Sequence, residues 1–347
     1  MLIPLRPIGA AAIVLAQIPV ATAHERLAIG DGRIANAPKA GYVFSCQQRF
    51  DPNAPGAQRS GNWISGGAWI PALKPFVDGA VAWPDAQIDV AVSGDKRIVR
   101  ANNLPKHKTG VFPVAANDDA ARYDRNPGRI RAQSILLELP ALPQLASVPS
   151  CVPMGMIGFA LTGVAIYNAL DARGQDAAAH EILDSCDGHP QQQGQYHYHA
   201  PSRCWTDAGK EANGHSDLIG YALDGFGIYG TSGGNGATVH NEDLDACHGH
   251  THAVTWDGKP VDLYHYHFTD EYPYSVGCFR GIVKTGQVAA PAREPQDGRQ
   301  MLRNAAAKLG IGERQLADAV GAPPPDFAAA ARKLGIAEAK IRAAFGQ

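Results

Sequence analysis

The sequence lacks an excess of charge of either sign. Its 347 residues include 31 Lys and Arg against 33 Asp and Glu, a formal net charge of −2. A protein that neutralises phosphates needs a basic surface, so this balance argues against nucleic acids as partners. The sequence also has no P-loop for phosphate binding and no His-Glu-x-x-His motif of zinc metalloproteases. Neither motif therefore indicates a function for this chain. Hydrophobic residues make up 45%, which is enough for a folded core.

Long apolar runs are also scarce. The clearest one, residues 8–20, is interrupted twice and is too short to span a membrane. Arg6 precedes this run, and small residues at Ala21 and Ala23 follow it. This arrangement predicts a secretory signal peptide at residues 1–23 and a secreted or periplasmic protein.

Cleavage after Ala23 would leave His24 as the first residue. A free α-amine and its own imidazole can chelate copper together with a second histidine, an arrangement called a histidine brace. The alternative is a chance residue at a cleavage site.

Glycine and proline are abundant, at 38 and 25 residues. Short strand-like runs at residues 41–46, 87–92 and 135–139 are separated by turn-forming clusters. This spacing is typical of an irregular, β-sandwich-like domain. We therefore expect a mainly β fold.

Three blocks of sequence occur twice in the same order. Residues 158–168 align with residues 220–230 at six of eleven positions. A Leu-Asp-x-Cys-x-Gly-His block and a Tyr-His-Tyr-His block follow in each copy. The order predicts a tandem duplication with pseudo-twofold symmetry, with repeat halves at about 158–204 and 220–281.

The composition changes near residue 291. Ala-rich stretches recur at residues 306–311 and 331–336, and Gly310 and Gly335 stand where helices commonly end. We expect two helical hairpins in residues 291–347, joined by three prolines, after a main domain of residues 24–290. The hairpins offer a surface for a protein partner but carry no His or Cys.

Histidine is the most informative residue type, because 11 of the 13 histidines lie between His180 and His267. Alternate residues of a strand share a face. Each Tyr-His-Tyr-His block therefore predicts a strand with an imidazole face and a tyrosine face. We expect the two imidazole faces to converge on one site. The predicted ligands, including one histidine from each Cys-x-Gly-His turn, are His189, His197, His199, His250, His265 and His267.

Clustered imidazoles favour zinc or copper as the bound metal. Asp184 and Asp245 occupy equivalent repeat positions and either orient a histidine or cap a turn. His180 and Glu181 have only a loose counterpart in the second copy, so Glu181 is a candidate general base. The alternative to metal binding is that the histidines form hydrogen bonds in a polar core.

Six cysteines in an exported chain predict three disulfides. Each repeat offers its own pair, and the remaining two cysteines tie the N-terminal half to the repeats. The predicted pairs are Cys186–Cys204, Cys247–Cys278 and Cys46–Cys151. The alternative for the cysteines in the Cys-x-Gly-His turns is a mixed thiolate–imidazole zinc site.

These motifs resemble the YHYH-domain family over roughly Tyr42 to Gly281. The similarity rests on several blocks: Gly188-His189-Pro190, residues 196–199, residues 220–226, Asp245-Ala246-Cys247, residues 264–267 and residues 277–281. The resemblance implies an exported protein and gives weight to the histidine blocks, but it implies no reaction.

Three functions follow from these observations. The first is an exported zinc- or copper-binding protein that stores metal or presents it to a partner. The second is a metal-dependent hydrolase or oxidase outside the cytoplasm, which would need an open coordination position. The third is a structural or adhesion module without metal.

Overall fold

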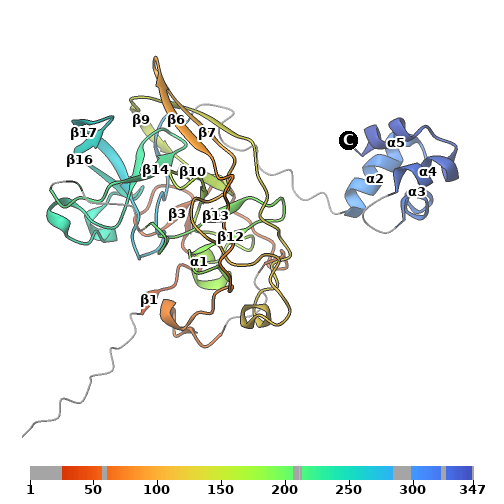
Figure 1. Cartoon of the computed structure of the whole chain (residues 1–347), viewed down its shortest axis with the longest axis horizontal. Helices are drawn as coiled ribbons and strands as arrows, with labels where there is room; N and C mark the ends of the chain where they lie inside the picture. Colours follow the sequence, from red (N-terminus) through yellow and green to blue (C-terminus); the bar gives the residue numbers. More distant parts are fainter. Residues whose placement is uncertain are drawn as a thin grey trace, which may run out of the picture.

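The computed structural model describes residues 26–56, 61–205, 211, 213–283, 298–321 and 326–345. The expected signal peptide, His24 and the three-proline linker lie outside these ranges. Two separate hydrophobic cores occur within them, one in the β-rich part and one in the C-terminal helices. Figure 1 shows the strands of the first part and the four helices of the second. The mainly β class with a small helical module is confirmed.

The largest sheet has eight strands, and their order is symmetric. From one edge to the other the order is β12-β13-β11-β10-β14-β15-β17-β16. The bounds are β10 Met156–Ala160, β11 Ala165–Tyr167, β12 Gly188–Pro190, β13 Tyr196–Tyr198, β14 Leu218–Ala222, β15 Gly227–Tyr229, β16 Gly249–Trp256 and β17 Lys259–His267. The two central strands, β10 and β14, are antiparallel neighbours. Each half then adds one hairpin partner, one parallel strand and one edge strand.

Glycine is required where the two halves meet. A Cβ atom at Gly220 would lie 2.3 Å from the Phe159 carbonyl oxygen, and one at Gly158 would lie 2.8 Å from the Tyr221 oxygen. Only glycine lets the backbones of β10 and β14 approach this closely. The first residue of each 11-residue repeat block therefore sits at the junction of the two halves.

Both Tyr-His-Tyr-His blocks are β-structure, as predicted. The first forms β13 and the residue after it, and the second ends β17. Their tyrosines and histidines are all buried, so both faces of these strands are covered. The imidazole face therefore lies inside the protein.

Smaller sheets complete the β-rich part. The expected strands near residues 87–92 and 135–139 are β6 and β8, whereas the run at residues 41–46 contributes only the short β3. The remaining strands are β1 Leu27–Ala28, β2 Ile34–Ala35, β3 Val43–Phe44, β4 Ile64–Ser65, β5 Ala68–Trp69, β6 Ile88–Ser93, β7 Lys96–Ala101, β8 Ile135–Pro140, β9 Leu145–Ser150 and β18 Phe279–Gly281. One helical turn, α1 Ala177–His180, and four 3₁₀ turns lie between strands: Pro71–Leu73, Asp119–Arg122, Gly234–Gly236 and Asn241–Asp243.

The three predicted disulfides are confirmed. The Cα–Cα distances are 5.0 Å for Cys46–Cys151, 5.1 Å for Cys186–Cys204 and 4.5 Å for Cys247–Cys278. The six cysteines are therefore paired with one another, and the thiolate–zinc alternative is wrong. Disulfides persist in oxidising compartments, which favours a protein that folds outside the cytoplasm.

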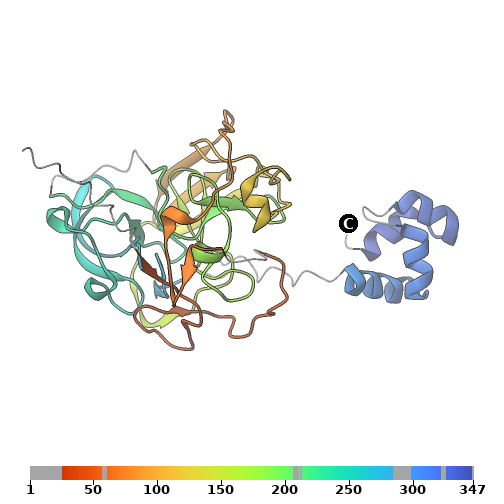
Figure 2. The same ribbon diagram turned by 90° about the horizontal axis from the view of Figure 1, so that it is seen from below.

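The C-terminal helices pack around their own small core. They are α2 Gly298–Leu309, α3 Glu313–Val320, α4 Phe327–Leu334 and α5 Glu338–Ala344 (Figure 2). Gly335 ends α4 with a left-handed φ of 66°, as expected for a C-cap glycine. None of the helices in the described ranges combines the length and the apolar character that crossing a bilayer requires.

Candidate metal centres

The histidines form two clusters rather than one. Cluster A consists of His189, His197 and His199, and cluster B consists of His215, His250, His252, His265 and His267. Within each cluster the potential ligand atoms lie within 4.8 Å of one another. Each cluster is therefore compact enough to surround a metal ion.

The predicted single site, shared by the two Tyr-His-Tyr-His blocks, is wrong. Four strands of the large sheet separate β13 from β17. At ~4.8 Å per strand this corresponds to about 24 Å along the sheet. β10 and β14 pair at the centre of the sheet, so β13 and β17 lie in opposite halves of it and their histidines do not meet.

The two clusters share the same three-histidine core. His189 pairs with His197 across β12 and β13, and His250 pairs with His265 across β16 and β17. His199 and His267 complete the two sets at equivalent positions of the repeat blocks. The same local pattern thus builds each site separately.

Glu181 joins the histidines of cluster A. Its Oε2 atom lies 3.2 Å from both His189 Nε2 and His199 Nε2. Glu181 Oε2 and His189 Nε2 are both buried, and neither makes a hydrogen bond with suitable geometry. Burial would raise the pKa of Glu181, but the two imidazoles hold it well below its usual value. A carboxylate and three imidazoles therefore face one another in a buried site.

A cavity of about 1120 Å³ borders cluster A. Glu181 and the three cluster A histidines line it, and so do Asp124 and Asp171. Burial raises the pKa of both aspartates. Tyr167, also in the lining, stacks on His197 with ring centroids 3.8 Å apart.

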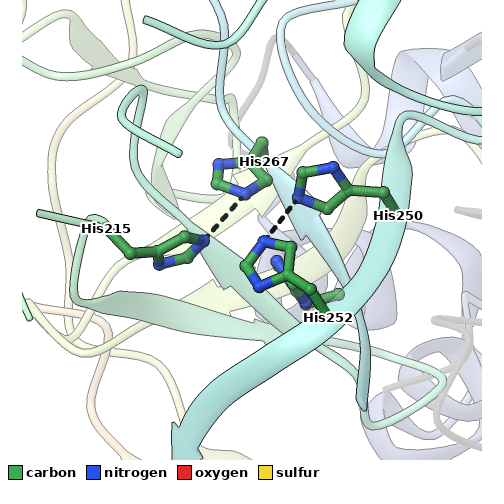
Figure 3. A group of neighbouring side chains, drawn as sticks. His215, His250, His252 and His267 are labelled. Atoms are coloured by element: carbon green, nitrogen blue, oxygen red, sulfur yellow. Dashed lines mark hydrogen bonds between the residues drawn. The ribbon is translucent and has the colours of Figure 1, made fainter. Parts of the chain in front are cut away.

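Cluster B contains imidazoles only. His250 and His252 project from β16, His267 ends β17, and His215 comes from the segment before β14 (Figure 3). The Nε2 atoms of His250 and His252 are 3.1 Å apart, and those of His215 and His267 are 3.2 Å apart. His265 Nε2 is buried without a hydrogen-bond partner.

Burial makes protonation of cluster B unfavourable. Burial, together with a smaller effect of the neighbouring imidazoles, lowers the pKa of His265 to about 2, of His267 to about 3 and of His250 to about 4. The pKa of His215 is also lowered, chiefly by burial. These four rings are therefore neutral near pH 7.

Main-chain carbonyls select the tautomer in both clusters. A carbonyl oxygen only accepts, so a ring Nδ1 bonded to it carries the proton and Nε2 keeps its lone pair. The Nδ1-to-carbonyl bonds are His197 to Gln195 at 3.1 Å, His199 to Asn168 at 2.6 Å, His215 to Ser216 at 2.8 Å, His265 to Leu263 at 2.9 Å and His267 to Gly230 at 2.6 Å. The same arrangement is common among metal-binding histidines.

The aspartates before the cysteines have other contacts. Asp184 accepts hydrogen bonds from the Tyr196 hydroxyl at 2.9 Å and from turn amides, and Asp245 accepts one from the Tyr264 hydroxyl at 3.0 Å. These bonds match the turn-capping alternative, and none of those described goes to a histidine ring. His180 pairs with Asp31 at 2.9 Å and does not belong to cluster A.

Two cluster B residues were missed in the sequence. His252 follows His250 at the same alternate spacing as the Tyr-His-Tyr-His histidines, so this spacing was a usable signal. His215 stands alone between Gly214 and Ser216 and offers no comparable pattern. It reaches the cluster only because its segment folds beside β17.

Residues 137–241 match a family model described as YHYH protein. No curated protein and no solved structure matches the chain. The matched range is shorter than the similarity expected from the motifs. It includes Glu181 and the three histidines of cluster A, and it ends before β16 and β17, which carry four of the five histidines of cluster B.

Proposed function

Since the chain carries a YHYH-family domain at residues 137–241, we propose that it is an exported protein that binds zinc or copper at two histidine sites. The main domain is residues 24–290 and arose by tandem duplication. Residues 291–347 form an accessory module. Cluster A and cluster B each take one metal ion.

The observation that carries this proposal is the contact between lone pairs. His197 and His199 face each other at 3.0 Å between Nε2 atoms, as His215 and His267 do at 3.2 Å. All four rings donate through Nδ1 to carbonyls, so lone pairs point at lone pairs. Such contacts repel unless a cation lies between the nitrogens.

A proton does not supply that cation efficiently near pH 7. Burial and the neighbouring imidazoles lower the pKa of His197 well below its usual value, and the pKa of His267 is about 3. A divalent metal ion uses the lone pairs without protonating the rings. Nitrogens ~2.0 Å from a tetrahedral ion stand about 3.3 Å apart, close to the distances in both pairs.

The chemistry of the donors also limits the metal. Neutral imidazoles with at most one carboxylate suit zinc and copper better than calcium or magnesium, which prefer oxygen ligands. The three disulfides favour an oxidising compartment, where copper as Cu(II) is accessible. A module without metal would leave His265 Nε2 buried without a hydrogen-bond partner.

Metal analysis of two double variants tests the proposal. We expect the protein, purified without chelator and dialysed at pH 8 with zinc or copper, to retain two ions per chain. His197→Ala with His199→Ala should remove the cluster A ion, and His265→Ala with His267→Ala should remove the cluster B ion. The exposed His240, outside both clusters, provides the control His240→Ala.

A folded protein that retains neither metal at pH 8 would refute metal binding. Circular dichroism of each variant establishes that it is folded. Retention of both ions by both double variants would show that the metal lies elsewhere.

A further inference from the structure

The two clusters differ in what surrounds the shared three-histidine core. Cluster A adds one carboxylate, Glu181, and cluster B adds two imidazoles, His215 and His252. The residue aligned with Glu181 in the second copy is Glu242, which is exposed on the turn Asn241–Asp243 and does not belong to cluster B. The extra ligands therefore break the symmetry of the repeat.

Ligand number separates the two sites. Five imidazoles are enough to fill a four- or five-coordinate zinc or copper ion without help from solvent. Cluster A offers only four donors, three imidazoles and Glu181, which leave one position of a five-coordinate ion open, and one position of a tetrahedral ion when Glu181 does not bind the metal. Cluster B is thus closed by its own side chains, and cluster A is not.

The cavity gives cluster A a route to external ligands. Its volume of about 1120 Å³ is larger than a metal ion and one water molecule need, and it is of the size that holds a small organic ligand. All four side chains of the site line it, and no residue of cluster B does. A coordination position left open at cluster A therefore faces this space.

The charges favour an anionic donor at that position. A divalent ion with Glu181 and three neutral imidazoles carries a net charge of about +1. Arg122 and Arg125 line the same cavity as Asp124 and Asp171, and their guanidinium groups can donate hydrogen bonds to an anion. Such groups suit the oxygens of a carboxylate or another small oxyanion.

We infer that cluster A keeps one metal coordination position open to the cavity and binds a small oxyanion there, whereas cluster B is coordinatively closed. This inference rests on the proposed function, because it requires metal at cluster A. It assigns ligand exchange, the first requirement of a catalytic metal centre, to one site only.

Azide binding to the copper-loaded protein tests the inference. Azide is a small anion, and its coordination to Cu(II) produces a new charge-transfer absorption band. We expect the full chain with two copper ions to bind one azide, with the spectrum of only one ion changed. The band should persist in His265→Ala with His267→Ala and disappear in His197→Ala with His199→Ala, which retains the cluster B copper.

Glu181→Gln gives a second measurement that preserves shape. Removing the negative charge should tighten azide binding several-fold, because the anion no longer meets a carboxylate. Glu242→Gln removes the same group at the exposed equivalent position and should leave azide affinity unchanged. Acetate should compete with azide for the same site if the ligand is an oxyanion.

The outcomes distinguish the two proposals. Failure to bind copper refutes the proposed function itself. Two bound copper ions that do not respond to azide, or a band that disappears with the cluster B histidines, refute only the open position at cluster A. Failure of acetate to compete refutes the oxyanion.

Discussion

Acid should destabilise the metal-free protein through the buried imidazoles of cluster B. Burial lowers the pKa of His265 to about 2 and of His267 to about 3, against ~6.5 in an unfolded chain. Below pH ~6.5 the unfolded chain binds protons that the folded protein does not accept. The contribution of the neutral His265 and His267 side chains to stability is therefore complete above pH ~6.5. It is lost as the pH falls from there toward their pKa values in the folded protein.

The expected loss follows from the difference in proton binding. At pH 5 an unfolded histidine with pKa ~6.5 gains about 2 kcal/mol by protonation. His265 and His267 together should then cost about 4 kcal/mol, a large part of the ~5–15 kcal/mol that stabilises typical domains. His180 acts in the opposite direction because Asp31 raises its pKa, despite burial, so it offsets part of the loss.

Urea unfolding at pH 7 and pH 5, in the presence of a chelator, measures this effect. Tryptophan fluorescence reports the β-rich part alone, since all five tryptophans precede residue 257. His267→Gln removes one titrating ring and should reduce the pH-dependent loss by about 2 kcal/mol. The exposed His240→Gln is the control and should keep the full loss. Equal stability at the two pH values, or an unchanged loss in His267→Gln, would refute the reasoning.

Three further predictions concern stability and the tail. Tyr266→Phe should cost about 1.5–3 kcal/mol in urea unfolding, because the Tyr266 hydroxyl donates to the buried Asp224 at 2.6 Å. The equivalent Tyr198 hydroxyl contacts a threonine hydroxyl at 3.2 Å and His107 Nε2 but no carboxylate, so Tyr198→Phe should cost only about 0.5–1.5 kcal/mol, and equal losses would contradict this. Replacing Cys186 and Cys204 by serine should lower the free energy of unfolding by about 3 kcal/mol, because the disulfide closes a short loop of 18 residues. An unchanged urea midpoint would contradict this prediction. Deletion of residues 291–347 should leave the metal content unchanged, because these residues contain no His or Cys; a folded truncation without metal would show that the boundary is misplaced.

Much of the site was available in the sequence because it depends on local geometry. Alternate residues of a strand share a face whatever the fold, so His265 and His267 had to project together. The order of the repeat blocks likewise paired each cysteine in the Cys-x-Gly-His turns with the later cysteine of its own copy. His252 could have been added by the same alternate spacing. Glu181 stands out in the sequence because its counterpart in the second copy is only loosely aligned, but no local pattern predicts its position against His189 and His199.

The tertiary structure alone decided which strands are neighbours. The repeat predicted two equivalent halves, and it did not say whether their histidine faces meet or point apart. Because β10 pairs with β14 at the centre, β13 and β17 lie in opposite halves of the sheet. The histidines therefore form two sites instead of the single site expected. His215 entered cluster B through the same long-range packing. Periodicity specifies the face of a strand, whereas strand pairing depends on contacts between residues far apart in the chain, which no local pattern encodes.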